Sequence, residues 1–395
     1  MNNIDRRKFL KASGLTVLPA LLPVSTLLAS EKTFNPTPAN EPIVKFYGDG
    51  ETFNAGEYLD TLQKIQTAKA IGRDSYGEGG AVADLESRFK EITGKERAIF
   101  MPTGTMANQL AISVLSGLNT KVFVQETSHV FRDEADAAQS VHQKRLIPLA
   151  KEETCFTSTQ LEDALKYIDQ GEVFKSGLGC VSIENPVRRT DGRMVPIEEL
   201  RKISQLCRSK NLPLHLDGAR IYLASAWSGV TIKEYASLFD TVYISLYKYF
   251  GASGGAILCG DKSIIDKMPH LIKVHGGTMY GNWTNAAMAL HRLEGVEKRL
   301  ADARKNWTAI SNAVNSAGDL KISPLDNGTN IYDVKFADKV NPGKMSEILN
   351  EKFFIRLPRP NEKGEGKLSV NETVLYRDPS YIINAFSSAA KTARG

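Results

Sequence analysis

Short apolar runs alternate with amphipathic segments through the middle of the chain. Five runs have the length and composition of buried strands, and one segment between two of them, residues 195–210 (VPIEELRKISQLCRSK), repeats its apolar positions with a helical period. The five runs are TKVFVQ at 120–125, GCVSIEN at 179–185, LPLHLD at 212–217, DTVYISL at 240–246 and GAILCG at 255–260. Strands that alternate with helices predict an α/β fold, with a mostly parallel sheet covered by helices on both faces.

The pattern changes near residue 296. A long helical segment begins there, and the runs after it are shorter and more polar. We therefore predict a large domain over residues 43–295 and a smaller α+β domain over residues 296–395. The proline-rich stretch EKTFNPTPANEP at 31–42 is typical of a linker in front of the large domain.

Residues 1–30 have the pattern of an export signal. DRRKFLKASG at 5–14 is basic, and two prolines interrupt the apolar stretch behind it, which is too short and too broken to span a membrane. The paired Arg6 and Arg7 make the segment resemble a twin-arginine signal peptide. The resemblance implies the twin-arginine export machinery as a partner and a periplasmic location. A disordered basic tail is the alternative.

The net charge does not indicate a nucleic-acid partner. The formal charge is +5, and the first 29 residues supply +3 of it through four basic side chains against Asp5. No basic stripe is left for a phosphate backbone. The four cysteines stand far apart without a C-x-x-C pair, which argues against a zinc site and against a disulfide framework. We predict no metal site.

Two charged residues stand where a parallel sheet places its binding site, just beyond the carboxyl ends of the strands. Asp217 ends one predicted strand, and the next strand is predicted to end at Lys248, within SLYKYFGASGG. A lysine in a strand buried on both faces is costly unless it is paired or neutral. The two residues are therefore either a structural ion pair or a reactive pair. A reactive pair suits pyridoxal 5'-phosphate, where a lysine forms the Schiff base and an aspartate pairs with the protonated pyridine nitrogen.

The cofactor's phosphate group needs a binding site, and the segment IFMPTGTMANQL at 99–110 is a candidate for it. A strand-like start leads into a helix at Thr103, Gly104 and Thr105, where free backbone N–H groups and hydroxyls meet the positive end of the helix dipole. The same residue types are also ordinary helix caps. His129 lies just past another strand end, where its imidazole either stacks on a pyridine ring or has a structural role.

From about residue 43 to 300 the chain resembles the threonine aldolase and β-eliminating lyase family of fold-type I pyridoxal-phosphate enzymes. Six motifs occur in the family's order and approximate spacing, which is far more specific than any one motif alone. They are YGEGGAVADLESRFKEITGKERAIFMPTGTMANQLA, ETSHVF, GRMVPIEELRKI, HLDGARIYLAS, SLYKYFGASGGAILCG and HGGTM.

The resemblance implies roles for ten residues. The implied catalytic residues are Lys248 as the Schiff-base lysine, Asp217 on the pyridine nitrogen and His129 stacked on the ring. The other implied cofactor contacts are Thr103, Gly104, Thr105, Ser245 and Tyr280. The implied substrate contacts are Arg220, on the carboxylate, and Tyr76. Because the family builds its site at a subunit interface, Tyr76 and Tyr280 are expected to cross to a second subunit of a homodimer or homotetramer.

The chain also departs from the family pattern. Gly48 stands where a serine usually touches the substrate carboxylate, and Tyr280 stands where an arginine is thought to reach a neighbouring phosphate. Pro186 and Val187 replace the threonine and histidine of another motif. A second carboxylate clamp has only three candidates, which are Lys367, Arg356 and Arg359.

The implied activity is cleavage of a small β-hydroxy amino acid into glycine and an aldehyde by a carbon–carbon lyase that uses pyridoxal 5'-phosphate. The lost clamps leave two alternatives open, which are β-elimination on a β-substituted amino acid and a non-catalytic binding protein that keeps the fold. Retention of Lys248, Asp217 and Arg220 together favours an enzyme, because a scaffold has no evident need for all three.

Overall fold

The computed structural model describes residues 41–394, and Pro42–Gly395 is one compact unit. The predicted signal peptide at 1–30 and nearly all of the predicted linker lie outside the described residues. Within the described part of the chain, no helix is both long and apolar enough to cross a membrane.

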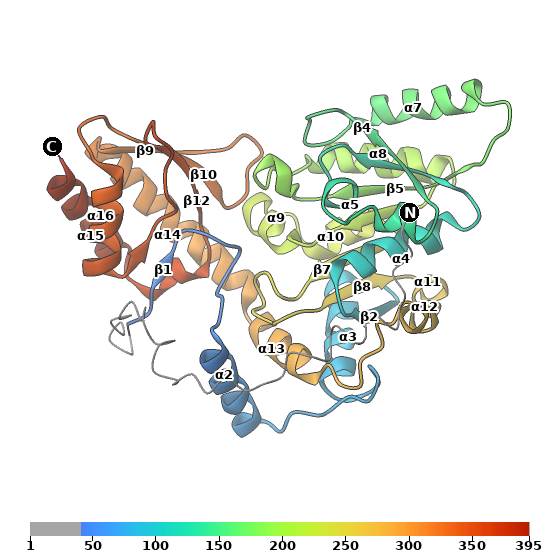
Figure 1. Ribbon diagram of the computed structural model, residues 1–395, viewed down its shortest axis with the longest axis horizontal. Helices are drawn as coiled ribbons and strands as arrows, with labels where there is room; N and C mark the ends of the chain where they lie inside the picture. Colours follow the sequence, from blue (N-terminus) through green and yellow to red (C-terminus); the bar gives the residue numbers. More distant parts are fainter. Residues whose placement is uncertain (1–40, 395) are drawn as a thin grey trace, which may run out of the picture. The chain divides into compact units, whose positions relative to one another are not determined.

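A seven-stranded sheet forms the centre of the first part of this unit (Figure 1). In spatial order its strands are β2 (Arg97–Met101), β8 (Ala256–Gly260), β7 (Thr241–Ser245), β6 (Leu214–Asp217), β5 (Leu178–Glu184), β3 (Lys121–Gln125) and β4 (Arg145–Leu149). Strands β7, β6, β5, β3 and β4 pair in parallel, whereas β8 runs antiparallel to both of its neighbours. The mostly parallel sheet and all five predicted strands are confirmed.

One predicted strand end is wrong. Strand β7 stops at Ser245, so Lys248 lies three residues beyond it instead of ending it. Just beyond β7, Leu246 donates its N–H to the carbonyl of Gly255, so the connection between β7 and β8 begins after this pair. Lys248 therefore belongs to this connection.

Helices cover both faces of the sheet, as predicted. The helices of this part are α2 (Ala55–Ala68), α3 (Gly80–Thr93), α4 (Gly104–Ser116), α5 (His129–Arg132), α6 (Ala137–Ser140), α7 (Ser158–Gly171), α8 (Ile197–Ser209), α9 (Ile221–Ser228), α10 (Ile232–Ser237), α11 (Lys262–Ile265), α12 (Met268–Val274) and α13 (Trp283–Leu293), with a short 3-10 helix at Arg188–Thr190.

Side-chain alternation along each strand separates the two cores. In β7, Val242 and Ile244 pack into the core that contains α3 and α8, whereas Tyr243 packs against α4 and α12. In β6, Leu214 and Leu216 join the first core, so His215 and Asp217 point to the face that α4 covers. The period of two thus brings the polar positions of β6 and β7 beneath α4.

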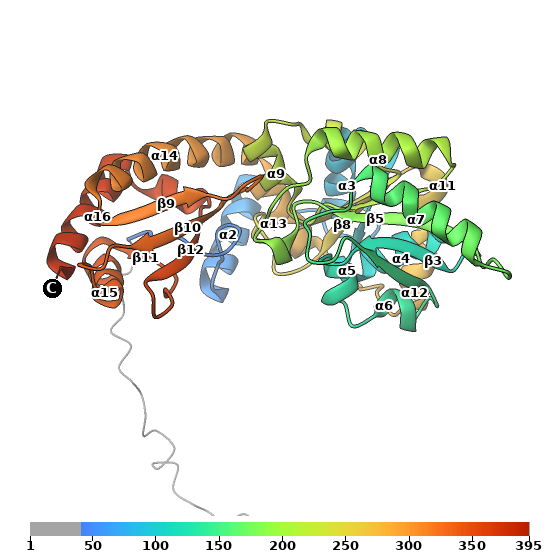
Figure 2. The same ribbon diagram turned by 90° about the horizontal axis from the view of Figure 1, so that it is seen from above.

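A three-stranded antiparallel sheet forms the second part, in the order β12 (Glu365–Ser369), β10 (Ile331–Phe336) and β9 (Leu320–Pro324). Its helices are α14 (Val296–Ala317), α15 (Pro342–Phe353) and α16 (Pro379–Ala393), with a 3-10 helix η3 (Glu372–Tyr376). Helix α14 packs on α9 at one end and on α16 and β9 further along, so it links the two parts (Figure 2). Helix α14 starts at Val296, and the domain boundary near residue 295 stays a prediction.

The first described strand joins the last part of the chain. Strand β1 (Val44–Lys45) pairs in parallel with β11 (Ile355–Arg356). The side-chain amide of Asn371 donates to the carbonyls of Lys45 and Tyr47, both at 3.1 Å. These contacts fix the segment that runs from β1 to Asp49, which reaches the site described next.

Candidate active site

A cavity of about 290 Å³ opens beyond the carboxyl ends of β3, β5, β6 and β7, the edge where a parallel sheet collects its functional groups. Five separate segments supply its polar side chains. Its titratable and polar lining residues are Thr103, Thr105, His129, Glu134, Glu184, Asp217, Tyr243, Tyr247, Lys248 and Ser253. The structure therefore brings together the predicted residues Lys248, Asp217, His129, Thr103, Gly104 and Thr105.

Lys248 is electrostatically perturbed. Burial, followed by the nearby Arg220 guanidinium, lowers the pKa of Lys248 to about 8. Arg220 is not in the cavity lining, and its Nε donates to Asp49 Oδ1 at 2.9 Å. A lysine with this pKa is largely neutral at mildly alkaline pH, which is the form that attacks a carbonyl.

Asp217 is held firmly at the end of β6 with only 3% of its surface exposed. Its Oδ1 accepts the backbone N–H of Ala219 at 3.1 Å, and its Oδ2 accepts the side-chain amide of Asn108 at 2.9 Å. Both donors are neutral groups, so neither supplies a counter-charge to the carboxylate.

His129 is positioned from two sides. Its backbone N–H donates to Glu184 Oε2 at 2.7 Å, and its Nδ1 lies 2.9 Å from Glu134 Oε1. The hydrogen bond with Glu134 raises the pKa of His129 above its usual value, against the opposing effect of burial. The second ring nitrogen, Nε2, is the one left for a ligand. Ligand atoms of His129, Glu134 and Asp217 lie within 4.8 Å of one another, a spacing that also suits a metal ion.

Glu184 and Glu134 are site residues that sequence reasoning missed. Burial, together with the charge of Asp217, raises the pKa of Glu184 to about 7. Glu184 is the last residue of β5, so the strand-end rule that found Asp217 applies to it as well. Glu134 follows a short helix and has no comparable signal in the sequence. Its Oε2 is buried without a hydrogen-bond partner among the described residues.

The start of α4 forms a close-fitting corner of the cavity. Thr103 caps the helix by accepting the N–H of Met106, while the N–H groups of Gly104 and Thr105 come too early for an acceptor within the helix. A Cβ atom on Gly104 would lie 2.0 Å from the hydroxyl oxygen of Tyr243. Only glycine therefore lets the helix N-terminus approach β7 this closely.

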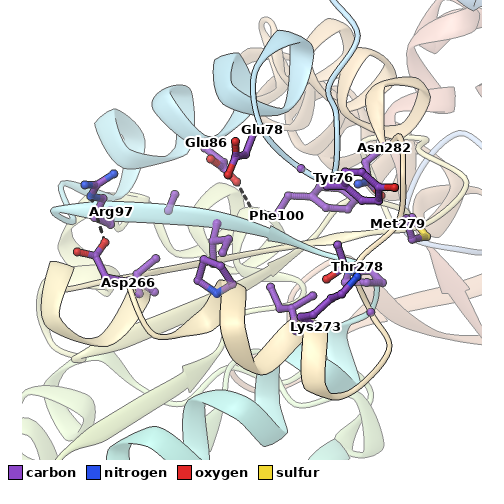
Figure 3. A pocket seen from close by; sticks show the side chains of 18 residues that line it. Tyr76, Glu78, Glu86, Arg97, Phe100, Asp266, Lys273, Thr278, Met279 and Asn282 are labelled. Atoms are coloured by element: carbon purple, nitrogen blue, oxygen red, sulfur yellow. Dashed lines mark hydrogen bonds and ion pairs between the residues drawn. The ribbon is translucent and has the colours of Figure 1, made fainter.

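Besides Arg220, three further predicted residues lie outside the cavity lining. Ser245 is fully buried in β7. Tyr76 lines a second hollow of about 540 Å³ beside the edge strand β2, together with Lys273 and Met279 (Figure 3). The Tyr76 N–H donates to the Tyr280 carbonyl at 2.9 Å, and the two rings pack edge to face with centroids 5.3 Å apart.

The candidates for a second carboxylate clamp are also elsewhere. Lys367 binds Asp333 at 2.9 Å and Asp191 at 3.1 Å. Arg356 donates to Asn350, and Arg359 lines a hollow on the second part of the chain. None of the three lines the cavity at Lys248. Val187, at the position of the family's second histidine, is fully buried.

Comparisons with known proteins agree with this geometry. The sequence profile of the β-eliminating lyase family matches residues 59–337. The low-specificity L-threonine aldolase of Candida albicans is 33% identical over 291 residues, which cover 73% of this chain and 76% of that protein. The alanine racemase TOXG of Cochliobolus carbonum is 35% identical over 211 residues, 53% of each chain.

The fold comparison gives the same result. A crystal structure of a candidate L-allo-threonine aldolase from Listeria monocytogenes superposes with a TM-score of 0.73 at 24% identity, covering 89% of this chain and 96% of that one. This likeness confirms the predicted fold class. Because the family profile spans well over half of the sequence, the chain belongs to the β-eliminating lyase family.

Proposed function

We propose that this protein is a carbon–carbon lyase that uses pyridoxal 5'-phosphate to cleave a β-hydroxy amino acid into glycine and an aldehyde. The observation that carries the proposal is that two residues share one cavity. They are Lys248, whose pKa is lowered, and Asp217, which is buried and accepts hydrogen bonds from neutral groups. The named threonine aldolases among the relatives support the choice of reaction.

The cavity fits this cofactor on three counts. The N-terminus of α4 offers two unpaired N–H groups to a phosphate, and Gly104 leaves room for its approach. Asp217 has lone pairs remaining for a pyridine nitrogen, and Lys248 provides the point of covalent attachment. Glu134 Oε2, buried without a hydrogen-bond partner among the described residues, supports a polar ligand in this cavity.

When bound, the cofactor supplies an electron sink for the carbanion left at Cα after a bond to Cα breaks. The protein's residues then select the bond and move the proton. Arg220 exchanges Asp49 for the substrate carboxylate and so fixes the orientation of the amino acid. His129, held at Nδ1 by Glu134, takes the β-hydroxyl proton at Nε2. With Val187 buried at the position of the second histidine, His129 carries more of this task.

Incubation of the purified, cofactor-loaded protein with candidate substrates tests the proposal. L-threonine, L-allo-threonine and phenylserine should yield glycine and the corresponding aldehyde, and Lys248→Ala should yield neither. Pyruvate from β-chloroalanine without any aldehyde product would identify a β-eliminating enzyme instead. The similarity to an alanine racemase favours one further assay, because D-alanine formed from L-alanine as the sole product would replace the lyase assignment.

We also propose that the site is completed in a homodimer or larger homo-oligomer. Tyr76 and Tyr280 are 58% and 63% exposed, and they pack on each other outside the cavity of their own chain. If they serve a site, it is the site of a neighbouring subunit. Light scattering should show at least a dimer, and Tyr280→Asp should dissociate it, whereas Tyr167→Asp on the 80% exposed Tyr167 should not. A wild-type monomer that still binds cofactor would refute the shared site.

Export is a separate proposal that rests on the sequence alone. The twin-arginine motif at Arg6 and Arg7 supports delivery of the folded protein to the periplasm. Replacing both arginines by lysine should retain the protein in the cytoplasm of a bacterial host, as cell fractionation would measure. Equal periplasmic amounts of the variant and the wild type would exclude this route.

A further inference from the structure

Asp49 comes from the first described segment of the chain and reaches the arginine assigned to the substrate carboxylate. Arg220, 171 positions later in the sequence, donates from Nε to Asp49 Oδ1 at 2.9 Å. The side chains of Arg220 and Asp49 are only 17% and 22% exposed. In the described part of the chain, Asp49 is the one carboxylate within ion-pair distance of Arg220.

The backbone is fixed on both sides of Asp49. Before it, the side-chain amide of Asn371 donates to the carbonyl of Tyr47 at 3.1 Å. After it, Gly50 packs on the connection between β7 and β8, where a Cβ atom on Gly50 would lie 2.9 Å from Tyr249 Cα. The contact with Arg220 can therefore be broken by a rotation of the Asp49 side chain, without movement of the segment that carries it.

This arrangement makes two carboxylates compete for one guanidinium. The chain supplies a carboxylate of its own at Arg220, where the proposed reaction needs the carboxylate of the substrate. An incoming carboxylate must break the existing pair before it forms its own, so its affinity reflects only the difference between the two contacts. An amine without a carboxylate has no part in this competition and leaves the pair intact.

We propose that Asp49 is a specificity-determining residue that occupies Arg220 before the substrate arrives and is displaced by the substrate carboxylate. Amino acids with a free α-carboxylate bind by this exchange, whereas the corresponding amines bind without it. The link to a substrate rests on the proposed function. The masking of Arg220 by Asp49 is a property of the chain itself, so it can be measured without cofactor or substrate.

The alternative role for Asp49 makes the opposite prediction. If Asp49 orients Arg220 and stays bound while the substrate contacts the other two guanidinium nitrogens, loss of its charge weakens amino-acid binding. If Asp49 competes with the substrate, loss of its charge strengthens that binding. The sign of the change in affinity therefore distinguishes the two roles.

The first experiment measures binding of glycine and of methylamine, which is glycine without its carboxylate, by absorbance titration of the cofactor-loaded protein. Asp49→Asn should bind glycine about tenfold more tightly and methylamine as the wild type does. Asp49→Ser should change binding in the same direction and decides the question if the asparagine variant does not fold. The matched control is Asp169→Asn on α7, which removes a 75% exposed carboxylate paired with Lys175 and should change neither affinity.

Two outcomes of this titration would overturn the proposal. Unchanged or weaker glycine binding in both Asp49 variants would show that Asp49 does not compete with a carboxylate. An equal gain for methylamine would show that Asp49 acts on the amine instead.

The second experiment uses the protein freed of cofactor and measures how fast phenylglyoxal labels Arg220, read by peptide mapping. An arginine without its carboxylate partner is more open to this reagent, so labelling should be several-fold faster in Asp49→Asn than in the wild type and unchanged in Asp169→Asn. Equal labelling of Arg220 in the wild type and both Asp49 variants would overturn the masking. Failure of the wild type to bind the cofactor would refute the proposed function, whereas the labelling rates would still decide the masking.

Discussion

Lys248 lines the cavity and has a pKa of about 8. The pH dependence of its reaction rate can therefore test both properties. The neutral amine is the reactive form, so the rate of pyridoxal 5'-phosphate capture by the cofactor-free protein should rise with pH and level off above about 8. Stopped-flow absorbance would measure it. Arg220→Met should move the midpoint to higher pH, because the guanidinium helps to lower this pKa.

The attachment site itself has a direct control. After borohydride reduction of the loaded wild type, peptide mapping should find the label on Lys248, and Lys248→Ala should carry none. A label on any other lysine would show that the cavity at Lys248 is not the cofactor site.

Glu184 should make the stability of the protein depend on pH. Its pKa is about 7 in the folded state against a usual value near 4.5, so the stability it contributes is present below about 4.5 and is lost as pH rises through 7. In the wild type, Glu184 should lower the free energy of unfolding by up to about 3 kcal/mol as the pH rises from about 4.5 to 7. In Glu184→Gln this decrease should be absent. Urea denaturation at several pH values would measure it. Glu86 has a pKa of about 7 as well, so only the difference between variant and wild type is informative.

Sequence reasoning located the residues that obey a positional rule. Asp217 and Glu184 are the last residues of their strands, and Lys248 lies shortly after one, so the strand-end rule points to all three. Asn108 and Glu134 could not be identified in this way. Their roles come from contacts with residues far away in the sequence, such as the hydrogen bond between Asn108 and Asp217, and no local pattern records such a contact.

At the scale of elements, the packing of α4 on β7 depends on Gly104. Gly104→Ala would bring a Cβ atom to 2.0 Å from the Tyr243 hydroxyl, so the helix must move. We expect a loss of about 2 kcal/mol in the free energy of unfolding, and weaker cofactor binding because the helix N-terminus shifts. Gly171→Ala is the matched control, since nothing lies within 4 Å of its Cβ position. Equal stability of both variants by thermal unfolding would contradict the packing argument.

Element prediction succeeded where the apolar pattern was strong. The five runs became β3, β5, β6, β7 and β8, and residues 195–210 contain α8. Strand β4 was not predicted, because it is an edge strand with Pro148 inside it and only Leu146 fully buried. The antiparallel direction of β8 also escaped prediction, since alternation indicates which face a residue occupies but not which way the strand runs.

At the scale of the whole compact unit, Glu372 joins three distant segments. It is 5% exposed and accepts hydrogen bonds from Arg292 on α13, from Arg299 on α14 at 2.8 Å and from the backbone of Glu51 at 3.4 Å. Glu372→Gln keeps the shape but leaves two arginines without their counter-charge. The free energy of unfolding should fall by about 3 kcal/mol, measured by urea denaturation.

A surface ion pair provides the comparison. Asp302→Asn removes the partner of Lys298, whose side chain is 80% exposed, and should change the free energy of unfolding by less than about 0.5 kcal/mol. If both variants lose the same stability, burial of the Glu372 cluster has no special effect.

The pairing of β2 with β8 has a consequence for how the protein matures. Strand β2 is at the sheet edge, β8 is its one neighbour in that sheet, and the register joins Arg97 to Gly260. Closing so long a loop carries a large entropic cost and is typical of slowly folding topologies. We therefore expect the start of α4, which directly follows β2, to settle into place only after β8 has been synthesised. Cofactor loading must then wait for the finished large sheet, and nascent chains that stop before residue 260 should remain in their unloaded form.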